Sequence, residues 1–337
     1  KRSVALDLKT PEDLAVARAL IGSADAVIEN NRAGVMERLG LAYEALKEAH
    51  PALVYCSISA FGQTGPRSGE GGFDVTVQAW SGIMSVTGEA GGGPVKCGVP
   101  VSDFTAGLYA AFATAAMLHR ARTTGEGGSV DISMLGASLA IGALQTSEYF
   151  GTGQDPRKLG SAHPRNAPYQ AFACQDGHVV IAAGTDKLWR DAARVMGLDD
   201  AVDDPRFAST ALRAQNQKAL ALLVEEHLAA FPRARILAEL AEAGVPCAPI
   251  AAYSEALADR QVVHAGWVEQ MELPGGARTR TFGTPVSING TREKVRKPAP
   301  ALGAHTAEVL AELKARDGQG TPPAPAPATA QGGSMPA

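Results

Sequence analysis

The sequence predicts an α/β fold in which helices cover a parallel sheet, followed by a smaller α+β domain. Three observations predict it. Strand-like apolar segments alternate with helix-like segments through the first third of the chain, as is typical of parallel sheets. A long segment rich in Ala and Gly, from Asp103 to Arg122, predicts a helix that can pack closely on a sheet or on a partner helix. Two strand-like segments joined by an Asp-Gly turn at residues 172–183 predict a hairpin that opens a second unit.

The first helix follows directly on the first strand-like segment. Apolar residues alternate over residues 4–8 and predict a strand at the start of the chain. Thr10 and Pro11 predict the start of a helix near 11–22, because a hydroxyl caps free backbone amides and proline suits the first helical position. A strand followed at once by a capped helix is half of a βαβ unit.

The alternation of strands and helices continues to about residue 149. The long helix is predicted to end at Gly125, since glycine readily adopts the left-handed conformation that terminates helices. The other elements expected in this region are strands near 26–28, 53–57 and 130–132 and helices near 42–49 and 134–149. Together they describe a parallel sheet covered by helices.

The composition changes after a polar segment that contains Gly and Pro. Beyond the hairpin, helices are expected near 187–196 and 217–243. The chain end is rich in Pro, Ala and Gly and is expected to be disordered, because it cannot bury a core. The predicted organisation is a large domain (1–151), a linker (152–168), a small α+β domain (169–262), a return to the large domain (263–313) and a tail (314–337).

Charge and cysteine content exclude several classes of function. Lys plus Arg number 31 and Asp plus Glu 35, and this net charge of -4 gives no general reason to expect a nucleic acid or an anionic membrane as partner. The four cysteines are scattered and lack metal or disulfide spacing, so a reducing cytoplasm is expected. No apolar run is expected to reach the length of a membrane span, and the sequence has neither HxxxH nor GxSxG.

Two loops follow predicted strands, where ligands of open α/β sheets usually bind. Glu29–Gly34 follows the strand near 26–28, and Arg38 lies about one helical turn further on. The alternatives are an ordinary turn with a solvated Arg32 and a surface salt bridge for Arg38. Ser59–Pro66 follows the next strand; its glycines allow a ligand to approach the backbone, and Phe61 can stack on a ring. This second loop lacks the Gly-Lys-Ser/Thr ending of a P-loop.

Four other positions have both a structural and a functional explanation. Asp103 can cap the first amides of its own helix, and Asp74 can cap a helix or face a ligand. Gly136, taken alone, is a small residue at a tight contact in the first turn of a helix. His163 lies in the linker-like segment, where a locally bonded loop histidine is a commoner explanation than a general base.

In their order along the chain, several motifs resemble those of the class III CoA-transferases. This is the formyl-CoA and carnitine-CoA transferase family, which also includes the α-methylacyl-CoA racemases. The motifs cover nearly the whole chain up to the tail and are jointly specific. The segments that carry the resemblance are Lys1–Lys9, Glu29–Gly40, Ser59–Pro66, Asp103–Gly107, Gly125–Leu135, His163–Phe172 and Pro298–Leu310.

The resemblance implies a Rossmann-like large domain built from both chain ends, a small inserted domain and an interlocked homodimer. It implies an enzyme that moves CoA between an acyl-CoA thioester and a carboxylic acid, with no tightly bound cofactor. The spacing of the cysteines and histidines predicts no metal site. In the family, an aspartate attacks the thioester and then carries CoA as an aspartyl thioester. The positions that match CoA-side loops of relatives are Asn30, Arg38, Phe61, Gly62 and Asp103.

The sequence departs from the family pattern at three places. Gly136 stands where the nucleophilic aspartate would follow Met134 and Leu135. The first βα unit of relatives is expected to be missing before Lys1. Asn31 replaces a common aromatic residue, and a glycine-run loop is absent near residues 164–168, so a formyl donor is not favoured.

These departures leave two alternatives to CoA transfer. The first is an isomerase similar to the α-methylacyl-CoA racemases, for which Asp103 matches the acid while Phe73 stands in place of the histidine. The second is a paralogue that binds CoA without catalysis. Phe73 makes the isomerase the weaker interpretation, whereas Gly136 makes covalent transfer by the usual route of the family doubtful.

Overall fold

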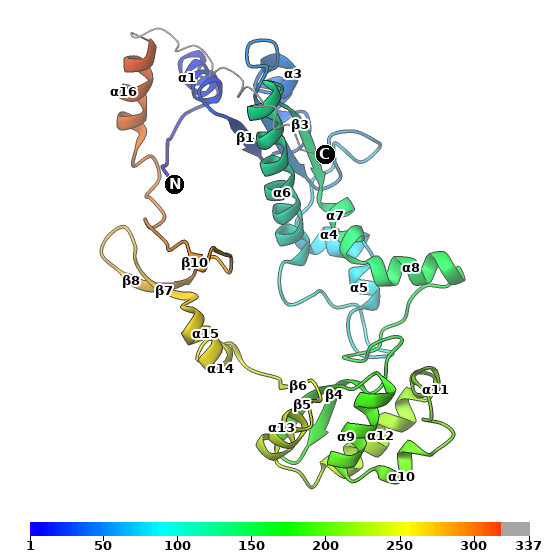
Figure 1. Cartoon of the computed structure of the whole chain (residues 1–337). Helices are drawn as coiled ribbons and strands as arrows, with labels where there is room; N and C mark the ends of the chain where they lie inside the picture. The colour runs from blue at the N-terminus through cyan, green and yellow to red at the C-terminus, as the bar shows by residue number, and fades with distance from the viewer. Residues whose placement is uncertain (318–337) are drawn as a thin grey trace, which may run out of the picture.

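The computed structural model describes residues 1–317 and has a mixed α/β architecture (Figure 1). Its first sheet has three parallel strands in the order β1-β2-β3. The elements of this region are α1 (Pro11–Gly22), β1 (Ala26–Glu29), α2 (Val35–Arg38), α3 (Tyr43–Leu46), β2 (Val54–Ser59), α4 (Asp74–Trp80), α5 (Ile83–Val86), α6 (Val101–Thr124), β3 (Gly128–Ser133), α7 (Met134–Ile141) and α8 (Ala143–Thr152).

The middle strand β2 is apolar and buried, since β1 and β3 pair with its two edges and α6 packs on its face. Val54, Tyr55 and Cys56 are buried, and α6 packs against both β2 and β3. Buried strands of parallel sheets are typically continuous apolar runs, which is the pattern that the sequence has here. The three predicted strands of this region are present, and their parallel pairing is confirmed.

The segment before α1 is bonded to the other end of the described chain. Ser3 donates its amide to Nδ1 of His305 at 3.1 Å, and Ala5 donates its amide to Oγ1 of Thr306 at 3.0 Å. The strand expected over residues 4–8 is therefore wrong, because this backbone bonds to the 303–306 turn and to no strand. The predicted start of α1 is confirmed, with Thr10 as its N-cap.

The cap of α6 comes from another helix. α6 begins at Val101, so Asp103 lies inside its first turn. Oδ1 of Asp74, the first residue of α4, accepts hydrogen bonds from the amides of Ser102 at 2.9 Å and Asp103 at 3.4 Å. The expectation that Asp103 caps its own helix is wrong, because Asp74 already binds these amides. The alternative that Asp74 caps a helix is confirmed.

α6 is also longer and more apolar than the sequence suggested. It ends at Gly125, which has the predicted left-handed conformation with φ 76°. An 18-residue stretch of it has a mean hydropathy of 1.3, so by length and composition it is the one helix of residues 1–317 that could cross a membrane. The statement that no apolar run has that length is therefore wrong. One side of α6 packs on the sheet, whereas Phe104, Leu108 and Phe112 are exposed.

Two predicted helices are each divided into two. The helix expected over 134–149 is interrupted at Gly142, where α7 ends and α8 begins. The helix expected over 217–243 is interrupted before Arg233, because Pro232 lacks the amide that would continue the helical hydrogen bonds. At both places the chain changes direction (Figure 1). The outer ends of each helix pair lie within a few residues of the predicted helix ends.

A second sheet, in the order β4-β5-β6, is antiparallel. The predicted hairpin is confirmed, since β4 and β5 are joined through the turn that contains Asp176. The elements of this region are β4 (Tyr169–Cys174), β5 (Gly177–Ala182), α9 (Asp186–Met196), α10 (Asp199–Val202), α11 (Thr210–Gln215), α12 (Gln217–Leu228), α13 (Arg233–Glu242) and β6 (Cys247–Pro249).

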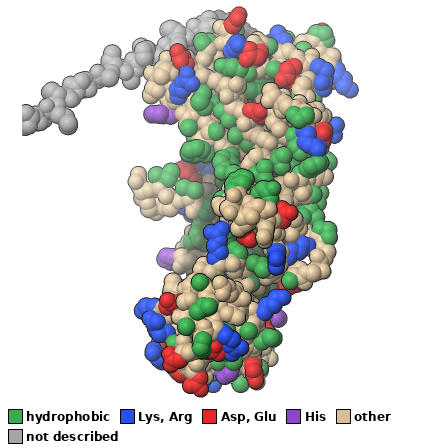
Figure 2. Space-filling view, turned by 90° about the vertical axis from the view of Figure 1, so that its right-hand side faces the viewer, with side chains coloured by type: hydrophobic (Ala, Val, Ile, Leu, Met, Phe, Trp, Pro, Cys, Tyr) green, Lys and Arg blue, Asp and Glu red, His purple; other side chains and the backbone are tan. Residues whose placement is uncertain are grey.

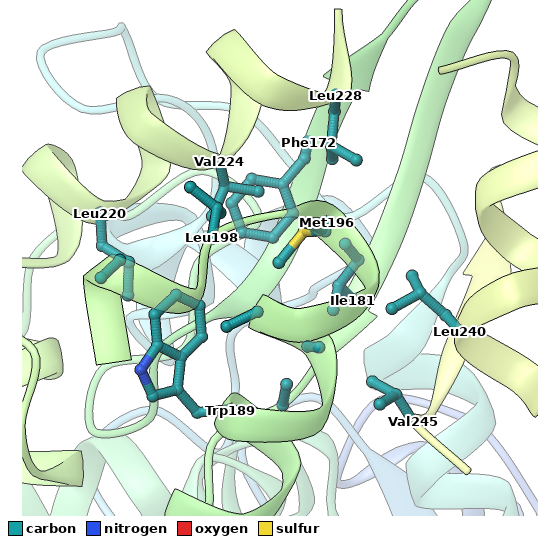
Figure 3. Close-up of a cluster of buried hydrophobic side chains, with 14 of the residues drawn as sticks. Phe172, Ile181, Trp189, Met196, Leu198, Leu220, Val224, Leu228, Leu240 and Val245 are labelled. Carbon is teal, nitrogen blue, oxygen red and sulfur yellow. The ribbon is translucent and has the colours of Figure 1, made fainter. Parts of the chain in front are cut away.

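The largest buried apolar cluster of the described residues belongs to this region (Figure 3). Phe172, Trp189 and Met196 are almost completely buried in it. Arg213 is buried beside the cluster, where it donates to the carbonyls of residues 167, 184 and 207 and to Asp186 at 2.8 Å. Because these residues contact one another and not the first sheet, this cluster forms a core of its own.

The chain then returns along the other side of the molecule to bring α16 next to α1 (Figure 1). The elements of this segment are α14 (Tyr253–Ala256), α15 (Arg260–Ala265), β7 (Val268–Glu272), β8 (Arg278–Phe282), β9 (Ser287–Ile288), β10 (Thr291–Arg292) and α16 (Thr306–Asp317). α16 runs past residue 314, where the tail was expected to start. The rest of that tail, 318–337, lies outside the described residues, and the division into domains stays a prediction.

Candidate functional site

A cavity of about 450 Å³ lies where β1 and β2 end. Its walls come from five segments of the chain: the loop after β1, the end of β2, the loop before α4, the first two turns of α6 and the first residue of α7. This is the edge of a parallel sheet at which ligands usually bind. The residues that line it are Asn30, Asn31, Arg32, Ile58, Ser59, Ala60, Glu70, Gly71, Gly72, Phe73, Asp103, Ala106, Gly107 and Met134.

The loop after β1 brings polar side chains to the cavity. Asn30 donates from Nδ2 to the carbonyl of Ile58 at 2.7 Å, which ties this loop to β2. Its neighbour Asn31 is held by Glu29, whose Oε2 accepts from the Asn31 backbone amide at 2.7 Å and from Asn31 Nδ2 at 3.0 Å. Two side-chain amides are thereby fixed at the cavity rim, where they can bond to polar groups of a ligand.

Arg32 lies against Gly71, and the absence of a side chain there is what makes room for it. A Cβ at Gly71 would lie 2.6 Å from Nε of Arg32, which is closer than real contacts allow. Next to it, Glu70 accepts from Arg67 at 2.8 Å, and the Arg67 guanidinium lies 3.7 Å from the ring centre of Trp80. Arg32 is therefore the cation that this loop presents to the cavity, while Arg67 is occupied by its own partners.

Asp103 reaches the cavity from the first turn of α6. Burial, followed by the neighbouring charge of Asp74, raises the pKa of Asp103. Asp74 is itself held by Gln78, whose Nε2 donates to Oδ2 at 2.6 Å, and Gln78 is completely buried. The start of α6 is further fixed to α7 by a hydrogen bond of 2.8 Å between the hydroxyls of Ser138 and Ser102. Buried polar contacts thus position the first turn of α6.

The loop after β2 is folded by contacts with β3. Gly62 has φ 94°, and its amide donates to Oγ of Ser59 at 3.1 Å. The next amide, of Gln63, donates to Oδ2 of Asp131 at 2.9 Å. Phe61 packs against the apolar cluster that underlies the cavity. Asp131 therefore has a structural partner in this loop.

Gly136 lies at the start of α7. Ser133 is the N-cap of this helix and accepts from the Gly136 amide at 3.2 Å. A Cβ at Gly136 would meet the Cβ and Oγ of Ser133 at 3.5 and 3.8 Å, which are ordinary contacts. The position is exposed, so the fold does not require glycine there.

His163 is bonded locally, as expected of a loop histidine. Its Nδ1 accepts from the amides of Arg165 and Asn166, each at 3.1 Å. Its ring lies 5.1 Å from that of Tyr169. Because Nδ1 accepts two amides, the proton of the neutral ring lies on Nε2.

Comparison with known proteins decides the family. A model of CoA-transferase family III matches residues 1–306. The chain belongs to CoA-transferase family III. This confirms the resemblance on which the sequence predictions depend, and it explains the order of the motifs along the chain.

The chain is similar to several proteins that are named as CoA-transferases. The succinate–glutarate CoA-transferase of Agrobacterium fabrum is 37% identical over 322 residues, which are 96% of this chain and 80% of that protein. The succinyl-CoA:glutarate CoA-transferase of Homo sapiens is 32% identical, with 93% of this chain and 72% of that protein covered. The acetyl-CoA:oxalate CoA-transferase of Acetobacter aceti is 35% identical, with 94% and 80% covered.

Solved structures of the family have a similar fold. A CaiB/BaiF family protein from Brucella suis superposes with a TM-score of 0.79 at 36% identity, covering 93% of this chain and 82% of that one. A protein of Mycobacterium tuberculosis gives a TM-score of 0.81 at 26% identity, with 91% and 80% covered. The mixed α/β architecture is therefore that of CaiB/BaiF family proteins.

The structure brings some of the predicted site residues together and leaves others apart. Asn30 and Asp103 line the same cavity. Phe61 and Gly62 lie in the adjacent loop, and neither they nor Arg38 in α2 belong to the lining. Gly136 lies two residues beyond the lining residue Met134 in α7. Their predicted roles at CoA stay predictions.

Sequence reasoning missed two charged residues of the cavity. An ordinary turn predicts a solvated Arg32, and none of the sequence motifs includes Glu70. The sequence signal for Arg32 is the glycine pair at 71–72. Glycine outside a turn often marks a place where another side chain packs directly against the backbone, as Arg32 does at Gly71. No local pattern marks Glu70, whose place depends on Arg67.

Proposed function

We propose that this chain transfers CoA between a short dicarboxylic acyl-CoA thioester, such as succinyl-CoA, and a second short carboxylic acid. The observation that carries the proposal is the similarity, over more than nine-tenths of the chain, to enzymes named for succinate, glutarate and mesaconate. The cavity supports it, because it combines a cation, amides and a carboxyl group at the edge of a parallel sheet.

The proposed CoA-side residues are Asn30, Arg38, Phe61, Gly62 and Asp103. Asn30 and Asp103 present polar groups at the cavity, and the loop of Phe61 and Gly62 is fixed beside it by Asp131. Arg38 is the last residue of α2, about one helical turn beyond the loop of Asn30, and would pair with phosphate oxygens of CoA. No tightly bound cofactor is part of the proposal, since CoA is itself the substrate.

Gly136 is proposed to occupy the position of the nucleophilic aspartate of relatives. It follows β3 and lies in the first turn of α7, where a side chain would be exposed and unobstructed. Because glycine has no functional group, the enzyme-aspartyl route that the family resemblance implies has no nucleophile at this position.

A cytoplasmic homodimer is also part of the proposal. Phe104, Leu108 and Phe112 lie at four-residue spacing on α6 and are 68%, 71% and 74% exposed in the single chain. Figure 2 shows hydrophobic side chains gathered in the middle part of one face. Exposed apolar surface of this extent favours association with another protein surface.

The test is formation of glutaryl-CoA from succinyl-CoA and glutarate, followed by chromatography. Binding of succinyl-CoA is measured separately by calorimetry. Binding with transfer supports the proposal, whereas binding without transfer to a panel of short acids identifies a non-catalytic paralogue. Incorporation of deuterium from D₂O into a 2-methylacyl-CoA would identify an isomerase. No binding of any CoA ester would contradict all three.

A further inference from the structure

Gly136 leaves open space next to the cavity wall. The amide of Leu135 donates to the carbonyl of Ala60 at 3.0 Å, and Ala60 lines the cavity. Gly136 is the next residue in α7 and is exposed. A Cβ there would have ordinary contacts with Ser133 at 3.5 and 3.8 Å, so a carbon atom fits without displacing the protein.

Three carboxylates of the chain around this space have other partners, and a fourth lies on a different helix. Glu70 is paired with Arg67 at 2.8 Å. Asp131 accepts the amide of Gln63, and Asp74 accepts the first amides of α6. Asp103, the remaining carboxyl group of the cavity lining, lies on α6 and not on α7. Among the described residues, none of these four carboxylates occupies the space at Gly136.

We propose that the acceptor acid takes this place: its own carboxylate lies beside Gly136 and attacks the thioester directly, in a ternary complex of protein, acyl-CoA and acid. The inference rests on the proposed function. An acid that ends in CH₂–COO⁻, as succinate and glutarate do, carries the same group that an aspartate side chain would place there. Arg32, the one Lys or Arg among the lining residues, supplies positive charge for an anionic substrate.

The direct route transfers CoA without a nucleophile from the protein, and every bond that forms is matched by one that breaks. An oxygen of the acceptor carboxylate bonds to the thioester carbon, the carbon–sulfur bond breaks, and CoA leaves as a thiolate. The product of this step is a mixed anhydride of the two acids. The thiolate then attacks the carbonyl carbon of the acceptor, a new carbon–sulfur bond forms, and the donor acid leaves as a carboxylate with one oxygen from the acceptor.

The fate of that oxygen distinguishes the two routes. The experiment is a single turnover with protein in excess over succinyl-CoA, in the presence of glutarate labelled with ¹⁸O in both carboxylates. The direct route places one ¹⁸O in the released succinate, which mass spectrometry detects. A route through a protein carboxylate releases unlabelled succinate in the first turnover, because the transferred oxygen comes from the protein. Unlabelled succinate would overturn the inference and leave the proposed CoA transfer standing.

Steady-state kinetics and one substitution give an independent test. The ternary complex predicts intersecting double-reciprocal lines, whereas a covalent intermediate predicts parallel lines. Gly136→Asn fills the space with a side chain that is not a nucleophile and should lower the transfer rate at least tenfold. Gly151→Asn is the matched control, since Gly151 is exposed in α8 and has open space around it. Parallel lines, or equal rates for the two variants, would overturn the inference. Absence of transfer by the unaltered protein would overturn both this inference and the proposed catalysis.

Discussion

Gly136→Asp should stabilise the protein and create a covalent route for CoA transfer. Ser133 already caps α7 and accepts the amide of residue 136. An acidic residue at this third helical position completes the Ser-x-x-acid pattern of a capping box. The carboxylate would stand in open space beside the cavity, with its Cβ in ordinary contact with Ser133. The substitution should therefore be tolerated and reactive.

The expected gain in stability has two sources. Replacing glycine inside a helix with aspartate gains about 0.3 kcal/mol from helix propensity. A negative charge in the first turn of a helix gains about 0.3–1 kcal/mol from the helix dipole. The sum is about 1 kcal/mol, which corresponds to a rise in melting temperature of about 2–4 °C for a domain of 150–250 residues. Gly136→Asn is the control, because it lacks the charge and should retain only the smaller part.

Chemical trapping tests the new route. After incubation of Gly136→Asp with succinyl-CoA alone, borohydride should reduce an aspartyl thioester and mark the protein at residue 136, whereas Gly136→Asn and the unaltered protein should remain unmarked. Double-reciprocal lines should change from intersecting to parallel. A variant that is less stable than the unaltered protein would refute the account of α7. A stable variant that forms no thioester would refute the assignment of residue 136 to the nucleophile position.

Three further substitutions test the fold and the cavity. Arg213→Ala should cost about 3–5 kcal/mol in the free energy of unfolding, because buried carbonyls lose their donor; unchanged denaturant unfolding would contradict this. Gly71→Ala should displace Arg32 and weaken succinyl-CoA binding severalfold by calorimetry, whereas Gly69→Ala, which meets no atom within 4 Å, should not. The raised pKa of Asp103 means that the folded state binds more protons than the unfolded state, so its contribution lowers stability as pH rises above about 4. Asp103→Asn should reduce the fall in melting temperature over this pH range. An unchanged dependence of melting temperature on pH would count against a raised pKa of Asp103.

Local patterns predicted most elements of the first sheet and the hairpin. Thr10 before Pro11 and the glycine at 125 correctly marked a helix start and a helix end, because each acts on backbone within a few residues. The segment 4–8 shows where such patterns fail. Its alternation fits a strand, but a strand needs a partner, and the available hydrogen-bonding groups lie near His305 at the far end of the described chain.

The cavity was predictable only in part for the same reason. Asn30 follows a strand, and that position alone indicates the binding edge of a parallel sheet. The sequence predicted Asp103 as a site residue, and it lines the cavity. Its predicted role as a helix cap was wrong, because the side chain that caps α6 comes from Asp74 in α4. Arg32 and Glu70 depend on contacts that no local pattern describes. The residues that the sequence did not predict are therefore those placed by contacts between loops that follow different strands.

The fold around Gly136 does not depend on a side chain at position 136. α7 is held by the Ser133 cap, by the bond from the Leu135 amide to Ala60 and by the contact of Ser138 with Ser102. None of these bonds uses a side chain at position 136. Loss of a nucleophile there removes one chemical group and leaves the cavity in place, because the groups that build the cavity bind one another. The same independence is why a carboxylate supplied either by the acceptor acid or by Gly136→Asp should meet an intact site.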